Sequence, residues 1–378
     1  MATIALTVDV KDRTGSAWWV SALLLVTMLP SVVVGLAAGP LVDRLSRKSL
    51  LVGADLARLA VFALLPFVGG APDILLLAAV AGVANSFFRP AVLAGVPNLV
   101  PDEELARGTA LLQTADWGAT AVGPVVAGAI VGFAGPHLVY WINAATFLFS
   151  ALLLVQIPAR RLQSAQGITH GHWRDLRRGF GEFRRSRALR TALFALGFAM
   201  VGGGFINVSE VFLATKSLHS GPLGYGLLWT ASGVGLLSGS LLVGGLLEDR
   251  PALGAYAWMF VVWAAGTLGA AVAPDLAVAA VAMVVAGLGN GLTFPTTVVI
   301  IQQAAADEIR GRVFTVIISV HNALLGLSFA AAAGLQQMLG ARWVFGGAAS
   351  ALLLGGMTAF ALTRGGEARV EMQRQQAA

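Results

Sequence analysis

Long apolar stretches constrain the fold of this chain more than any other feature of its sequence. A transmembrane helix needs about 20 mostly apolar residues to cross the hydrocarbon core of a bilayer. Eleven stretches reach this length: 17–38, 48–69, 72–96, 109–133, 136–157, 190–214, 222–247, 252–273, 276–302, 312–335 and 339–363. Inside lipid, only helices and closed barrels satisfy all their backbone hydrogen bonds. The sequence therefore predicts an all-α polytopic membrane protein.

The composition of the chain supports a membrane location. Of its 378 residues 12% are charged, whereas soluble domains carry about 25% charged residues. The 46 glycines suit closely packed membrane helices, because small residues let helix backbones approach. The chain contains no cysteine, which excludes disulfides, thiol catalysis and thiolate metal sites. We expect the lipid bilayer as a partner, and neither a cofactor nor a metal.

The positions of Lys and Arg predict how the chain is oriented. The side of the membrane that holds the segment 39–48 carries 19 of them, against four on the opposite side. By the positive-inside rule, the basic side is cytoplasmic. We therefore expect a multi-pass protein of the plasma membrane (a bacterial inner membrane) with a cytoplasmic C-terminus. The same rule accounts for the net charge of +6, so we expect no nucleic-acid partner.

The two halves of the chain repeat each other at a shift of about 205 residues. The segment 81–85 matches 286–290, and Gly135 matches Gly340. An even number of spans separates the copies, so they are parallel repeats about an axis along the membrane normal. We expect four parts: an N-terminal helical half (1–157), a basic cytoplasmic linker (158–189), a C-terminal six-helix half (190–363) and a cytoplasmic tail (364–378).

The repeat also predicts a helix that the chain largely lacks. The first helix of the second half begins near Arg190, so its partner in the first half would begin before Met1. We therefore expect the first helix to be truncated. A misassigned start codon and a real truncation both explain this, and the two explanations stay open.

The loop after the first full span resembles a family motif. Residues 39–48 read Gly-Pro-Leu-Val-Asp-Arg-Leu-Ser-Arg-Lys. This is similar to the loop G-x-x-x-D-R-x-G-R-R of the major facilitator superfamily, with Ser46 in place of the second Gly. The segments 12–17 and 143–147 resemble the macrolide-efflux and enterobactin-exporter branch. The resemblance implies a major facilitator fold of two six-helix halves and a secondary transporter that works by alternating access.

A second motif bears on the direction of transport. The segment Gly123-Pro124-Val125-Val126-Ala127-Gly128 resembles the G-P-x-x-G-G motif of the superfamily's antiporters and exporters, although close helix packing explains it equally. The resemblance implies export of amphipathic small molecules (drugs, macrolides or siderophore-like compounds). Protons are a candidate coupling ion, yet Ala78 and Ala79 stand where many drug exporters carry an arginine.

Other functions remain as alternatives to export. The chain could import a small nutrient, or it could have lost transport together with its first helix. An enzyme is not expected, because the sequence contains no P-loop, no H-E-x-x-H and no nucleophile motif.

The resemblance implies that the loop forms a conformational latch. A basic loop that only sets topology is the alternative. Asp55 and Arg58 lie near the loop at i, i+3 spacing, so they can pair on one helix face. The residues expected in the latch region are Gly39, Asp43, Arg44, Arg47, Lys48, Asp55 and Arg58.

Polar residues inside the predicted spans indicate a substrate or proton pathway, because such residues are usually functional. Asp116 and His321 are related by the repeat, and we expect them to face each other across a central cavity. Asp116 is a candidate for cation binding or proton exchange, whereas His321 could also serve as an interhelical hydrogen-bond partner. Glu210 is a candidate proton site, gate contact or solvated residue. Their polar or aromatic neighbours are Gln113, Trp117, Asn207 and Asn322.

Overall fold

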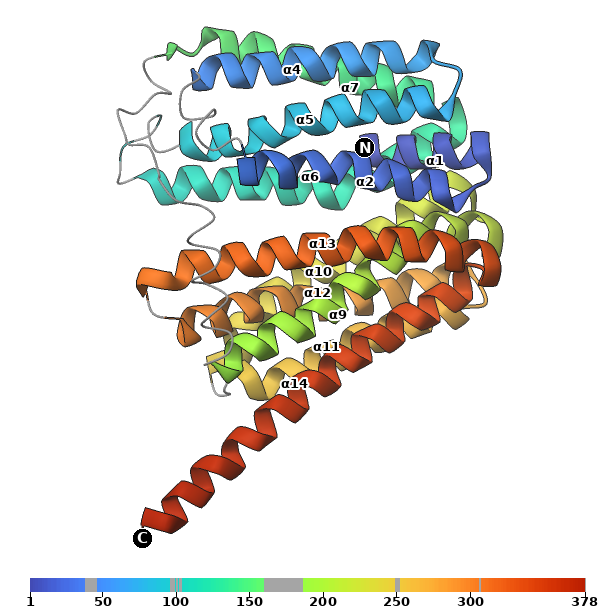
Figure 1. Cartoon of the computed structure of the whole chain (residues 1–378). Helices are drawn as coiled ribbons and strands as arrows, with labels where there is room; N and C mark the ends of the chain where they lie inside the picture. Colours follow the sequence, from blue (N-terminus) through green and yellow to red (C-terminus); the bar gives the residue numbers. More distant parts are fainter. Residues whose placement is uncertain are drawn as a thin grey trace. The chain divides into compact units, whose positions relative to one another are not determined.

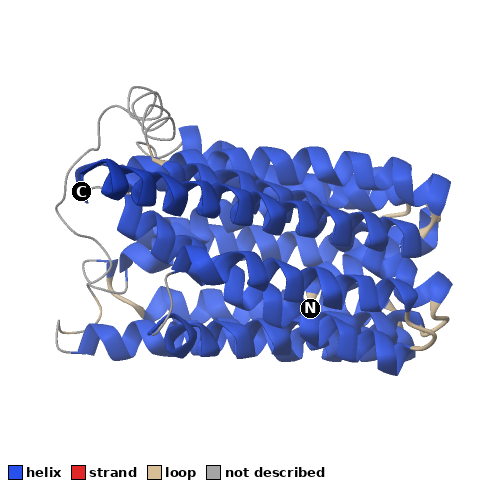
Figure 2. Ribbon diagram, turned by 90° about the horizontal axis from the view of Figure 1, so that it is seen from below, coloured by secondary structure: helices blue, strands red, loops and turns tan. Residues whose placement is uncertain are grey.

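In the computed structural model, the described part of the chain consists of helices joined by short loops, without a strand (Figure 2). It describes residues 1–37, 46–95, 99, 101, 104–159, 186–248, 252–305 and 307–377. Within these ranges, nine helices are long and apolar enough to cross a membrane, and two shorter apolar helices cover Ala17–Pro30 and Gly118–Ala134. The prediction of an all-α polytopic membrane protein is therefore confirmed.

The chain forms two compact units. The first holds the described residues up to 159 together with Gly221–Leu227. Its helices are α1 (Ala2–Thr14), α2 (Ala17–Ala37), α4 (Arg47–Leu64), the 3-10 turn η1 (Leu65–Phe67), α5 (Ala71–Gly95), α6 (Leu105–Ala134) and α7 (Pro136–Gln156). In this unit α4 packs against α5 and α7, and α2 packs against α5. The short helix α1 contacts α2, α5, α6 and α7, so it lies inside the packed unit.

The second unit holds the described residues 186–220 and 228–377. Its helices are α9 (Arg187–Phe212), η5 (Leu213–Ser217), most of α10 (Gly221–Glu248), α11 (Ala252–Val272), α12 (Leu276–Ala304), α13 (Asp307–Leu339) and α14 (Ala341–Ala377). Here α9 packs against α13 and α14, and α11 packs against α12 and α14 (Figure 1). The helix α14 continues through 364–377, which we expected to form a tail after the last span.

Two glycines let the chain reverse between consecutive helices. Gly135 lies between α6 and α7 with φ of 77°, and Gly340 lies between α13 and α14 with φ of 80°. A positive φ favours glycine, which has no Cβ to clash. The two positions are partners in the sequence repeat, so a glycine with positive φ lies between the last two helices of each repeat.

Glycines also allow helix backbones to touch. In the first unit, a Cβ on Gly82 of α5 would lie 3.0 Å from the carbonyl oxygen of Thr27 in α2. In the second unit, a Cβ on Gly287 of α12 would lie even closer to the carbonyl oxygen of Ser232 in α10. Both members of the second contact follow those of the first by 205 residues. Equivalent backbone contacts therefore occur in the two units.

The helix α12 uses its glycines on two faces. Gly287 and Gly291 face the backbone of α10, whereas Gly289 faces the backbone of α11 at Trp263. A Cβ at any of the three would come closer than 3.0 Å to a backbone atom of the neighbouring helix. Since apolar burial gives little drive for association within lipid, such close van der Waals packing supplies much of the cohesion.

Substitution Gly287→Ala is expected to destabilise the second unit by about 1–3 kcal/mol, because the added methyl group would overlap the backbone of α10. The measurement is the thermal unfolding midpoint of the purified protein in detergent. Gly244→Ala on α10 is the matched control, since no atom of a neighbouring helix lies within 4 Å of the added Cβ. Equal midpoints for the two variants would contradict this account of α12.

Candidate functional site

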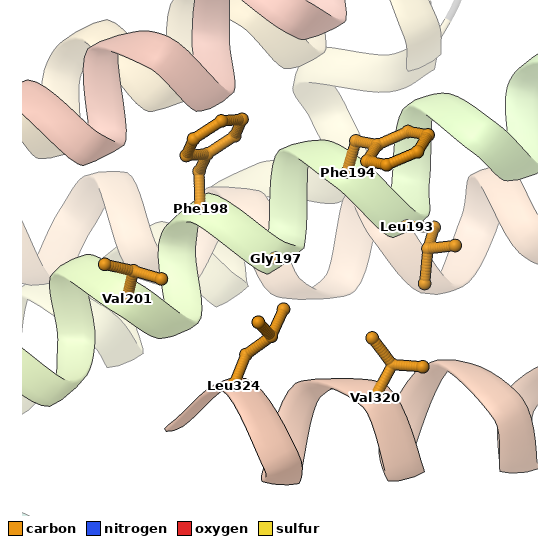
Figure 3. A pocket seen from close by; sticks show the side chains of 7 residues that line it. All are labelled: Leu193, Phe194, Gly197, Phe198, Val201, Val320 and Leu324. Atoms are coloured by element: carbon orange, nitrogen blue, oxygen red, sulfur yellow. The ribbon is translucent and has the colours of Figure 1, made fainter. Parts of the chain in front are cut away.

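An apolar pocket lies between α9 and α13 in the second unit (Figure 3). Its volume is about 350 Å³. In Figure 3, Val320 and Leu324 point from α13 toward α9, whereas Phe194 and Phe198 project from the other side of α9. All the lining side chains are apolar, so the pocket suits an apolar or aromatic part of a ligand. The residues that line it are Leu193, Phe194, Gly197, Phe198, Val201, Val320 and Leu324.

Two polar contacts hold α9 and α13 together at the ends of this pocket. At one end, Nε2 of His321 lies 3.5 Å from the carbonyl oxygen of Leu193. At the other end, the hydroxyl of Ser328 donates to the carbonyl oxygen of Val201 at 2.6 Å. Between them, a Cβ on Gly197 would lie 3.2 Å from Cδ1 of Leu324, so the glycine lets α13 approach α9 closely. The pocket therefore lies between two interhelical contacts and borders a close approach of the two helices at Gly197.

His321 is buried, at 6% exposure, and its neighbour Asn322 is half-buried. Its contact with Leu193 corresponds to the interhelical hydrogen bond that the sequence offered as the alternative to a place in the substrate or proton pathway. Asp116 belongs to α6 in the first unit, where it is exposed. The side chains of its neighbours Gln113 and Trp117 lie outside the described residues. The pairing of Asp116 with His321 stays a prediction.

The structure describes the expected latch loop only from Ser46 onward. Gly39, Asp43 and Arg44 lie outside the described residues. Arg47 is the first residue of α4. The ammonium group of Lys48 donates to the carbonyl oxygen of Val155 at 2.6 Å, which joins the start of α4 to the end of α7. The role of this loop as a latch stays a prediction.

The expected pair of Asp55 and Arg58 is present in α4. The guanidinium Nη2 of Arg58 donates to Oδ1 of Asp55 at 2.5 Å, and both residues are buried. The guanidinium carbon also lies 4.1 Å from the ring centre of Phe88 and 4.6 Å from that of Phe147. Cation–π attraction to two rings favours the charged guanidinium in this apolar setting. The cluster joins α4, α5 and α7.

A second charged cluster, which the sequence patterns did not predict, lies at α1. The Tyr140 hydroxyl donates to Oδ2 of Asp9 at 2.8 Å, and Nε of Arg13 donates to Oδ1 of Asp9 at 2.6 Å. Arg13 also donates to the carbonyl oxygens of Val68 and Gly69, each at 3.0 Å. The hydrogen bond to Asp9 raises the pKa of Arg13. The signal in the sequence was an acidic residue in an apolar segment, four positions before an arginine.

The Gly123-Pro124-Gly128 segment lies in α6, with Pro124 inside the helix. A Cβ on Gly128 would come closer than 3.0 Å to the carbonyl oxygen of Pro222, and Gly226 meets Gly128 reciprocally. Pro222 and Gly226 are part of the first unit, in the short segment Gly221–Leu227. The small residues of the motif therefore make a tight helix contact. Gly123 is less crowded, since a Cβ added there would lie 3.5 Å from the nearest atom, the backbone nitrogen of Met1.

Glu210 lies in the last turn of α9, and only 3% of it is exposed. Burial excludes the alternative of a solvated residue in this conformation. Asn207, one turn earlier, is half-buried. In the part of the chain that the structure describes, no three His, Asp or Glu residues come together as a metal site.

These features define a polytopic membrane protein of two helical units, with buried charges in one unit and an apolar pocket in the other. The family model described as Major Facilitator Superfamily matches residues 1–250. The chain belongs to this superfamily, as the loop motif and the repeat led us to expect.

Two relatives carry names of efflux proteins. The chain is 27% identical over 385 residues to "Multidrug efflux pump Tap" of Mycobacterium tuberculosis, and the match covers 93% of this chain and 87% of that protein. It is 24% identical over 239 residues to "Macrolide efflux protein A" of Streptococcus pyogenes. That second match covers 62% of this chain and spans only 59% of the relative's length.

Solved structures of transporters share the fold. The nucleoside transporter NupG superposes with a TM-score of 0.75 at 15% identity, covering 96% of this chain and 94% of that chain. A bacterial homologue of the iron transporter ferroportin, in an inward-facing state, gives a TM-score of 0.73 at 12% identity, covering 96% and 95%. At these identities the similarity shows the fold alone.

The charged cluster in α4 leads to a prediction about stability. Arg58→Met is expected to destabilise the protein by about 3 kcal/mol, because it leaves the Asp55 carboxylate buried without its partner. Adding Asp55→Leu should recover part of this loss, since the unpaired charge is then gone. Unfolding of the wild type, both single variants and the double variant forms a double-mutant cycle. Strictly additive losses would contradict a coupled pair.

Proposed function

We propose that this chain is a secondary transporter that exports amphipathic small molecules by alternating access. Its site of action is the bacterial plasma membrane, with the C-terminus in the cytoplasm, as the distribution of Lys and Arg predicts. Membership of the superfamily supports transport, and similarity to a named multidrug efflux pump along 93% of the chain supports export.

The apolar pocket between α9 and α13 is the observation that favours an amphipathic substrate. A cavity of about 350 Å³ with only apolar lining offers no hydrogen-bond partner for a sugar or a nucleoside. It can take an aromatic ring system of a substrate, held by contact and by exclusion of water. A polar or cationic part of the substrate would then require groups elsewhere in the pathway.

The exposed carboxylate of Asp116 is our candidate for binding the cationic part of the substrate. A membrane potential acts on a cationic substrate with about 2.3 kcal/mol per charge per 100 mV, so charge recognition affects the driving force as well as affinity. Gln113, Trp117, Asn207, His321 and Asn322 remain candidates along the same pathway.

Filling the pocket tests the substrate class. Cells that express the chain should accumulate less of a fluorescent amphipathic dye than cells with an empty vector. Val201→Phe places a ring in the pocket and should raise the half-saturating dye concentration for efflux by about tenfold. Val281→Phe is the matched control, because Val281 lies on α12, away from the pocket, and is 67% exposed.

The outcomes of this experiment separate the alternatives. Greater dye accumulation in expressing cells would indicate import. Equal accumulation across several dyes would contradict multidrug export. Efflux that is equally impaired by both substitutions would remove the pocket from the substrate path.

The charge of the substrate gives a further test. Asp116→Asn is expected to weaken efflux of a cationic dye while efflux of a neutral amphipathic dye of similar size is retained, because only the cation loses an attraction. The two dyes are compared in the same cells at matched expression. An equal loss for both dyes would indicate a general effect on folding or motion.

A further inference from the structure

The carboxyl group of Glu210 is buried without a partner. Its Oε1 atom forms no hydrogen bond, and no ion pair of the described residues includes it. The hydroxyl of Ser209, the preceding residue, is also fully buried and has no hydrogen-bond partner. Two neighbouring polar side chains near the end of α9 therefore lack the partners that buried polar groups normally have.

No Lys or Arg of the described residues forms an ion pair with Glu210. Lys216 of η5 lies 5.3 Å from the ring centre of Phe212, and Arg342 of α14 donates to the carbonyl oxygen of Ala271 at 2.8 Å. Between Leu276 and Ala304, α12 has no ionisable residue.

The described residues of the second unit include two histidines, His219 and His321. His219 follows η5 in the loop before α10. His321 of α13 meets α9 at Leu193, which is 17 residues, or about 25 Å along the helix, from Glu210. In the spans of the second unit that the structure describes, Glu210 is the only acidic residue.

An ionised carboxylate in this place would be held in an apolar environment without a counter-ion, which is strongly unfavourable. The group is tolerated here when it carries a proton, because a neutral carboxylic acid costs much less to bury. The first unit shows the contrast: its buried carboxylates of Asp9 and Asp55 each pair with an arginine.

The backbone beside Glu210 is irregular. Directly after α9, residues Leu213–Ser217 form a single π-helical turn, and the amide of Leu218 bonds to the carbonyl oxygen of Leu213. The amide of Leu213 is shared between the carbonyl oxygens of Ser209 and Glu210. Such turns often occur at functional sites, where a helix must change shape locally. A change in this turn could bring the carboxyl group into contact with water.

We propose that Glu210 is the proton-binding group of the second unit and couples transport to the proton gradient. In the conformation seen here the carboxyl group holds the proton as an O–H group. When the end of α9 opens to water, the O–H bond breaks, the proton passes to water and the carboxylate remains. This inference rests on the transport activity proposed above, and it assigns the coupling ion and its site.

Assays of the whole chain reconstituted in liposomes can separate proton coupling from transport of the substrate. Liposomes that contain a pH-sensitive dye report proton movement, while an amphipathic fluorescent cation reports transport. With Glu210→Gln, exchange of the cation without a gradient should continue, whereas accumulation driven by a pH gradient should fall to the level of liposomes without protein. Glu210→Asp should restore part of the gradient-driven accumulation. Glu104→Gln is the matched control, because Glu104 is exposed before α6 and its side chain makes no cap hydrogen bond.

Undiminished gradient-driven accumulation and proton movement in Glu210→Gln would overturn the proposal. Loss of both exchange and gradient-driven accumulation in Glu210→Gln, with normal Glu210→Asp, would also overturn it, since the carboxylate would then bind the substrate. If the wild type transports no cation at all, the proposed export function fails instead.

A labelling experiment tests proton binding without any transport. Dicyclohexylcarbodiimide is soluble in lipid and reacts with protonated carboxyl groups in apolar surroundings. Mass spectrometry of the wild type should find the label on Glu210, with more label at acidic than at alkaline pH. Absence of label, or a yield that does not change with pH, would overturn the proposal independently of the liposome result.

Discussion

Close contact between helix backbones is the constraint on which this structure depends. Within lipid, neighbouring helices gain little from hiding apolar side chains, so cohesion comes from van der Waals contact and from a few polar links. The glycines of α12 meet α10 on one face and α11 on another, and Gly82 makes the equivalent contact in the first unit. Gly197 has the same property beside the pocket, because a Cβ there would lie 3.2 Å from Cδ1 of Leu324, and the glycine lets α9 and α13 come close.

The buried charges divide into two kinds. Asp55 pairs with Arg58, and Asp9 pairs with Arg13 while also accepting from Tyr140, so these charges are neutralised where they lie and tie helices together. Glu210 has no such partner. A paired charge stabilises one arrangement of helices, whereas an unpaired acid changes its charge when its surroundings change. This difference is the physical basis for assigning structure to the first kind and proton exchange to the second.

Much of the fold could be predicted because the bilayer makes helix length and apolar character visible in the sequence. Local sequence accounts for the glycine turns between helices, at Gly135 and Gly340. The i, i+3 spacing likewise accounts for the pairing of Asp55 with Arg58. The network of Asp9 with Tyr140 joins residues 131 positions apart, so no local pattern could reveal it. The pocket was equally hidden, since its lining residues look like any other apolar side chains in two distant spans.

The sequence by itself determined that the chain crosses the membrane many times, that its halves repeat and that it resembles a family of transporters. These properties depend on residue type and spacing along the chain, which lipid enforces through backbone hydrogen bonding. Only the tertiary structure decided that Glu210 is enclosed without a partner and that α9 and α13 leave an apolar pocket between them. The burial of a side chain and its hydrogen-bond partners depend on the residues around it. Helices far apart in the sequence supply those residues.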